Sequence, residues 1–148
     1  MAVLFRITMM FVGYVWACVA ASLVLAVATL TPQWDSFFYA LGLQSPHAQS
    51  VAMWVVVGLG ALVIFAVGFL PVLLIIIVTE GFALRSAIIY GVIGAALAMV
   101  MVYGFDFAGY VGAPGSDLTH EREVFAAAGI AGGLVYWLFA GRRAGAWK

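Results

Sequence analysis

The stretch VAMWVVVGLGALVIFAVGFLPVLLIIIVT, at positions 51–79, decides the fold, because it runs for 29 residues without a charged side chain. A bilayer hydrocarbon core about 30 Å thick needs roughly 20 apolar residues in helical conformation to cross it. Core helices of water-soluble proteins rarely stay uncharged for so long. The segment is therefore predicted to cross a membrane.

Three further uncharged stretches surround it, and together they give four predicted spans at 7–30, 51–78, 86–105 and 124–141. Hydrophobic residues make up 67% of the chain and charged residues 8%, against about 45–50% and about 25% in a soluble domain. Lipid must therefore solvate the outer surface of the folded protein. The sequence predicts an all-α integral membrane protein, with residues 1–148 forming one up-down-up-down bundle of four transmembrane helices.

The basic residues are distributed unevenly between the two sides of such a bundle. The side holding both termini and the loop between the second and third spans carries Arg6, Arg85, Arg142, Arg143 and Lys148. The other side carries only Arg122. Because cytoplasmic flanks are enriched in Lys and Arg, both termini are predicted to be cytoplasmic. The composition is similar to that of small bacterial inner-membrane proteins, which predicts the cell inner membrane as the location.

The first span could also be a cleaved signal peptide, with Arg6 before it and the small residues Ala26 and Ala28 at the cleavage site. Its apolar run exceeds the roughly 7–15 residues of a signal-peptide core. A retained helix is the favoured interpretation.

The second span is too long for one straight crossing and contains Pro71. Proline removes a backbone hydrogen bond inside a helix and clashes with the preceding turn. A strong tilt, a kink at 68–71 or a projection beyond the membrane would each accommodate the length, and we expect a kink combined with tilt. The short turn at 79–81 predicts that the second and third helices are antiparallel neighbours.

Small residues indicate where helices touch, because close backbone packing drives helix association in lipid. In the third span Ala87, Gly91 and Ala95 recur at four-residue spacing, with Gly94 and Ala98 beside them. In the fourth, Gly129 and Gly133 form a GxxxG pattern. We expect the third and fourth helices to pack through these faces. The same faces would also suit a homodimer.

The outer loops show little chemistry. The apolar segment 37–43 is predicted to form a short interfacial helix, and Ser116 or Asp117 to cap the last helix. His47 and His120 lie outside the spans, which excludes a bis-histidine haem within the bundle. Cys18 is the only cysteine, and no metal, phosphate-loop or protease motif occurs. We expect no cofactor, no metal and, with zero net charge, no nucleic-acid partner.

Ionisable groups close to the membrane are the candidate functional residues. Glu80 and Arg85 stand at the cytoplasmic edge of the second and third spans, while Asp106 and Arg122 stand at the outer edge. We expect Glu80 to pair with Arg85, and Asp106 to link to Arg122. A sharper interpretation makes Glu80 a proton or cation ligand beside the Pro71 kink.

Three functions follow from these patterns. The favoured one is a structural or accessory subunit that binds itself or other membrane-protein subunits through its helices. The alternative is a small transporter or ion pathway with Glu80 near the Pro71 kink. It is disfavoured because few polar residues lie inside the spans and no second broken helix matches the first. The third is an enzyme acting on a membrane substrate with His47 or His120 as the base. This function is the least favoured, and we expect the protein not to be an enzyme.

Overall fold

Every element of the computed structural model, which describes residues 2–30, 34–42, 45–81, 86–104 and 118–143, is a helix. The elements are α1 (Ala2–Leu30), α2 (Trp34–Ala40), α3 (Pro46–Gly81), α4 (Ala87–Gly104), α6 (Leu118–Phe139) and the 3₁₀ turn η2 (Gly141–Arg143). All but α2 and η2 contain a segment long and apolar enough to cross a membrane. The predicted all-α class with four long apolar helices is confirmed.

Three helices begin five or six residues before their predicted spans, the first of them α1, which starts at Ala2 instead of residue 7. Helix α3 starts at Pro46, five residues earlier than the prediction, because Ser45 caps it: the Ala48 N–H donates to Ser45 Oγ at 3.2 Å. Proline suits the first helical position because it has no N–H to leave unpaired. Helix α6 starts at Leu118, six residues early. The predicted caps Ser116 and Asp117 lie outside the described residues.

A short helix is also present between the first two long ones, as predicted. It spans Trp34–Ala40 and therefore begins three residues before the expected segment. Phe38 is its buried side chain, and Phe37 meets the Phe38 ring edge-on at 5.7 Å between centroids. Whether this helix lies in the membrane interface stays a prediction.

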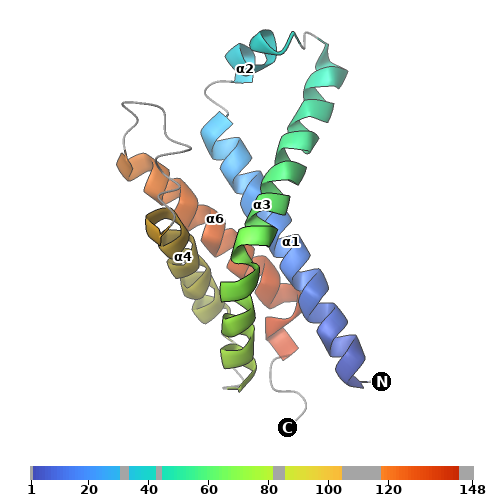
Figure 1. The fold of residues 1–148 in the computed structure, drawn as a ribbon, viewed down its shortest axis with the longest axis vertical. Coiled ribbons are helices and arrows are strands. Elements are labelled where there is room, and N and C mark those ends of the chain that lie inside the picture. Colours follow the sequence, from blue (N-terminus) through green and yellow to red (C-terminus); the bar gives the residue numbers. More distant parts are fainter. Residues whose placement is uncertain (1, 31–33, 43–44, 82–85, 105–117, 144–148) are drawn as a thin grey trace.

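The four long helices alternate in direction, with α1 and α4 rising and α3 and α6 descending in Figure 1. Helix α4 packs along α6, α6 along α1, and α1 along α3. Helices α6 and α1 are thus the two inner members of this order, while α3, among the described helices, packs closely on α1 alone. The expected pairing of the second and third helices is wrong for the described residues, because α3 and α4 make at most marginal contact. Their short connection does not force them together, and α3 finds its close packing on α1.

Helix α3 is unusually long and continues unbroken through Pro71. At 1.5 Å per residue its 36 residues extend about 54 Å. Figure 1 shows that it changes direction along its course and that its upper part rises above the other long helices. The excess length is therefore met by bending and by projection beyond the bundle. A kink located at Pro71 itself stays a prediction.

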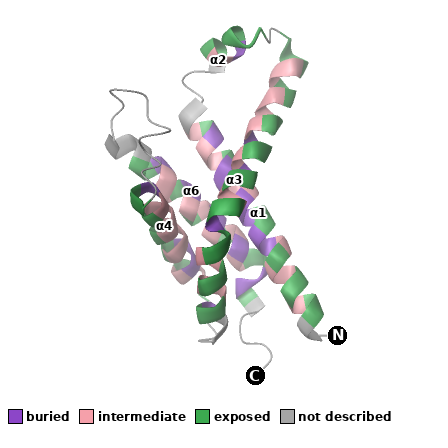
Figure 2. Ribbon diagram, viewed as in Figure 1, coloured by how far each residue is buried: buried purple, intermediate pink, exposed green. Residues whose placement is uncertain are grey.

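Buried residues concentrate where α1 and α6 cross, whereas α3 is exposed along most of its length (Figure 2). The main buried cluster consists of Tyr14, Ala17, Cys18, Ala61, Tyr90, Tyr136 and Ala140. Its aliphatic members are small, which lets the backbones approach closely in lipid.

Candidate functional site

Helices α4 and α6 meet backbone to backbone at their glycines. A Cβ atom placed on Gly94 would collide with the Gly129 carbonyl, and one on Gly129 would collide with the Gly94 carbonyl and crowd Ala98 Cβ. A Cβ on Gly133 would likewise collide with the Tyr90 carbonyl. No larger residue fits at these three positions unless the helices separate.

The contact face of α4 is rotated relative to the predicted one. Gly94 and Ala98 lie against α6, and a Cβ on Gly91 would still reach the Ile130 and Leu134 side chains at 3.8 Å. Gly91 is buried, whereas Ala87 and Ala95 are half-buried, as Gly94 and Ala98 are. Gly129 and Gly133 are therefore occupied within the chain and are closed to a second copy in this arrangement.

A neighbouring face of α6 packs on α1 in the same way. A Cβ on Gly132 would lie 3.1 Å from the Ala17 carbonyl oxygen, and one on Gly13 would lie 3.1 Å from Phe139 Cβ. Near one end of this contact the Trp16 and Phe139 rings stack with 6.3 Å between centroids. Helix α6 has small residues on two faces, which explains how it packs closely on both α4 and α1.

Hydrogen bonds hold α1 against α3. The Tyr14 hydroxyl donates to the Phe65 carbonyl at 2.8 Å, and the Ser22 hydroxyl donates to the Val57 carbonyl at 2.8 Å. Gly60 provides the space for Ser22 Oγ. In lipid such interhelical bonds contribute on the order of 1 kcal/mol each.

The contacts of these two polar residues were missed from the sequence, which indicated only that few polar residues lie inside the spans. The available signal was their spacing, since Tyr14, Cys18 and Ser22 recur every four residues along one face of α1. All three are buried. Spacing alone does not say which helix covers that face.

The predicted ionisable residues are brought together only in part. Arg122 is exposed at the start of the α6 span, and its guanidinium carbon lies 5.4 Å from the centroid of the Tyr103 ring on α4. A cation–π contact therefore links the ends of α4 and α6. Glu80 lies in the last turn of α3, but its side chain is outside the described set, as are Arg85 and Asp106. Their predicted pairings stay predictions.

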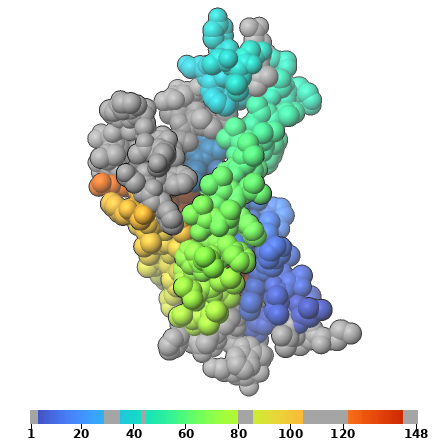
Figure 3. All heavy atoms as spheres, in the orientation of Figure 1, coloured from blue at the N-terminus to red at the C-terminus, as the bar shows by residue number. Residues whose placement is uncertain are grey.

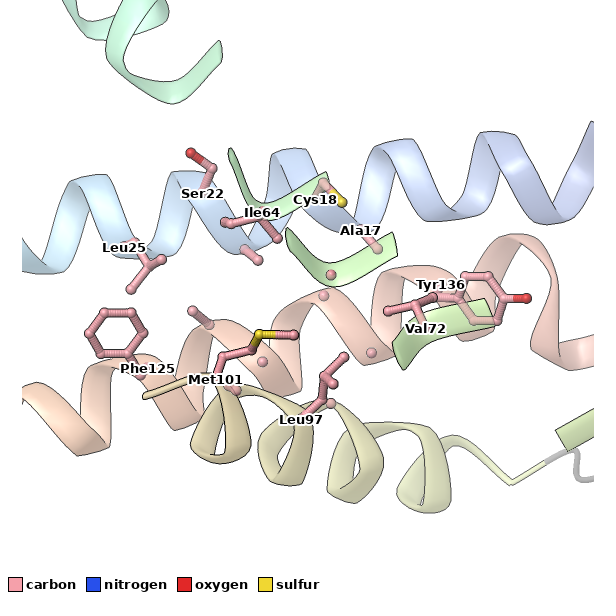
Figure 4. Close-up of a pocket in the computed structure, with 18 of the residues that line it drawn as sticks. Ala17, Cys18, Ser22, Leu25, Ile64, Val72, Leu97, Met101, Phe125 and Tyr136 are labelled. Carbon is pink, nitrogen blue, oxygen red and sulfur yellow. The ribbon is translucent and has the colours of Figure 1, made fainter. Parts of the chain in front are cut away.

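A cavity of about 510 Å³ lies between α1, α3, α4 and α6. In Figure 4, α1 runs along one side of it and α4 along the other, with α6 between them and cut segments of α3 crossing the view. Met101 and Leu97 reach in from α4, Phe125 and Tyr136 line it from α6, and Cys18 lines it from α1. In the space-filling view, atoms of α1 are visible in a recess beside α3 (Figure 3). The cavity is what separates α3 from α4.

The cavity lining is apolar and offers little to water. Among the described lining residues there is no carboxylate, amine, guanidinium or imidazole. The Tyr14 and Ser22 hydroxyls already donate to α3 carbonyls. A buried water needs two to four polar partners. The site therefore suits an apolar occupant rather than an ion or a reacting polar substrate.

The cavity is open on one side rather than enclosed (Figure 3). In a bilayer the hydrocarbon chains of the surrounding lipid have access to such an opening, and an apolar lining is solvated by them as well as by other helices.

Comparisons of the chain with protein-family models, with curated protein sequences and with solved structures give no match. Functional conclusions accordingly come from the sequence and the geometry.

Proposed function

We propose that this protein is a structural or accessory subunit of a membrane assembly, which binds another membrane protein or a second copy of itself through α3. In this proposal four helices span the cell inner membrane as an up-down-up-down bundle with both termini in the cytoplasm. The observation that carries the proposal is the position of α3, which among the described helices packs closely only along α1.

The free face of α3 has the regular spacing of a helix-packing surface. We call it the outer stripe, and it consists of Leu59, Leu62, Ala66, Leu70, Leu73 and Ile77. These residues recur every three or four positions, lie opposite the α1 contact and are all exposed. Because α4 and α6 use their glycines on each other, α3 is the helix left to meet a partner.

Co-purification in mild detergent tests this proposal. Two differently tagged copies are expressed together, one is purified, and the second copy and any other membrane proteins retained with it are identified. Leu62→Ala combined with Leu70→Ala should release the partner or second copy, because both side chains point away from the rest of the chain. Ile88→Ala with Val100→Ala on α4 is the matched control, since these residues are equally exposed. A wild-type protein that purifies alone as a monomer contradicts the proposal.

The alternative of an ion or proton pathway draws no support from the described cavity lining, which carries no carboxylate. Ile76, one turn before Glu80, lines the cavity. An Ile76→Cys variant in a Cys18→Ala background that reacts with a water-soluble thiol reagent would revive this alternative.

A further inference from the structure

The shape of the cavity limits what it can hold. Its lining runs from Tyr14 to Ala26 on α1 and from Tyr90 to Val102 on α4, which at 1.5 Å per residue is about 18 Å. On α3 it runs from Val56 to Ile76, about 30 Å. One leaflet of the hydrocarbon core is about 15 Å deep. The cavity is therefore elongated along the helices and at least as long as one leaflet is thick.

A transmembrane helix is a poor fit to this space. With its side chains such a helix is about 10–12 Å across. A partner helix would enter only if α3 moved away from α1, which would break the bonds of Tyr14 and Ser22 to α3 carbonyls. A single hydrocarbon chain is much thinner and needs no such movement.

We propose that the cavity binds one acyl chain of a bilayer phospholipid, which enters between α3 and α4 and lies against α1 and α6. The chain meets Leu97 and Met101 from α4 and Phe125 from α6, all of which line the cavity (Figure 4). Because the described lining carries no formal charge, the headgroup stays outside at the membrane surface. The bound chain holds α3 at its distance from α4.

Photolabelling of the wild-type protein tests the proposal. The protein is placed in phosphatidylcholine vesicles that contain a phosphatidylcholine with a diazirine on one acyl chain, irradiated and mapped by peptide mass spectrometry. We expect adducts at Leu97, Met101 and Phe125 as well as at outward residues such as Val100, which is 62% exposed. Adducts confined to outward residues would show surrounding lipid only and would overturn the proposal.

A filling variant sharpens the test. Leu97→Trp places an indole in the cavity and should abolish the inward adducts while the outward ones persist. Val100→Trp, on the same helix but absent from the cavity lining, should leave the map unchanged. Met101→Trp is the second filling variant if the first does not accumulate in the membrane. Inward adducts that survive both filling variants count against a chain in this cavity.

A partner helix in the cavity predicts a different result. In that case the residues inside the cavity would not be labelled while the partner is bound and would be labelled after the partner dissociates. This result would also overturn the lipid proposal. The assay is independent of the proposed function, because association is probed at the outer stripe and lipid at the inner side of α3. Either proposal can fail while the other stands.

Discussion

At the scale of single residues, two hydroxyl groups inside the described part of the bundle have specific partners on another helix. Tyr14 and Ser22 point across to α3 carbonyls. Thr8, which is exposed, donates instead to the Leu4 carbonyl of its own helix at 2.9 Å. The first two bonds join helices, and the third does not. Their removal should therefore have different consequences.

Tyr14→Phe keeps the ring but removes the donor to the Phe65 carbonyl. We expect a loss of about 1 kcal/mol of unfolding free energy, and a similar loss for Ser22→Ala. The two losses should add, because eight residues separate them by about 12 Å on one helix. Unfolding in a denaturing detergent, followed by steric trapping or fluorescence, measures both. Thr8→Val should be nearly neutral.

Gly129→Ala tests the backbone contact of α6 with α4. The added methyl would collide with the Gly94 carbonyl, so the helices must separate, and we expect a loss of at least about 2 kcal/mol. Gly58→Ala on α3 is the control, because nothing lies within 4 Å of a Cβ at that position. Thermal aggregation in mild detergent compares the two. Equal stability of both variants would mean that α4 and α6 do not meet at Gly129.

At the scale of elements, the order in which the helices pack reflects where small residues and hydroxyls lie on each. Helix α6 has small residues on two faces and packs closely on both α4 and α1. Helix α3 offers Gly60 and Gly68 to Ser22 and Tyr14 of α1. A short connection brings two helix ends together, but it does not supply a packing surface between them.

Disulfide formation can test that order. In a Cys18→Ala background, Ser22→Cys with Gly60→Cys should cross-link readily, because a Cβ on Gly60 touches the Ser22 side chain. Val67→Cys with Leu97→Cys, on opposite walls of the cavity, should not cross-link. Mobility on a non-reducing gel reports both. The reverse pattern would place α3 against α4 and remove the cavity.

At the scale of the whole molecule, the four long helices form an open arrangement with a recess beside α3 (Figure 3). In water such an arrangement would collapse. In a bilayer, lipid fills the recess and covers the exposed leucines at little cost. The packing within the chain therefore leaves α3 available for contacts outside it.

The predicted topology belongs to this scale. Reporter domains fused after Gln44, Arg85 and Gly115 should lie outside, inside and outside the cytoplasm respectively, because five of the six basic residues fall on the inner side. Alkaline phosphatase activity and green fluorescence distinguish the two compartments. Reporters at Gln44 and Gly115 that disagree with each other would contradict four crossings.

The sequence by itself determined the number, type and approximate position of the long helices. Each prediction rested on a local property, namely the absence of charge over a length sufficient to cross hydrocarbon. It also identified the glycines that α4 and α6 use, because small side chains are local too. Helix ends were less accurate: the start of α3 depended on a cap at Ser45 outside the apolar run.

Only the tertiary structure decided which helices are neighbours, which side of α4 packs and where the cavity lies. In lipid every helix face is acceptably solvated, so apolar pattern does not distinguish a face that packs from one that meets acyl chains. That choice depends on complementary shapes on two helices at once. Ser22 fits over Gly60, and Gly94 fits over Gly129, only after the chain has brought them together.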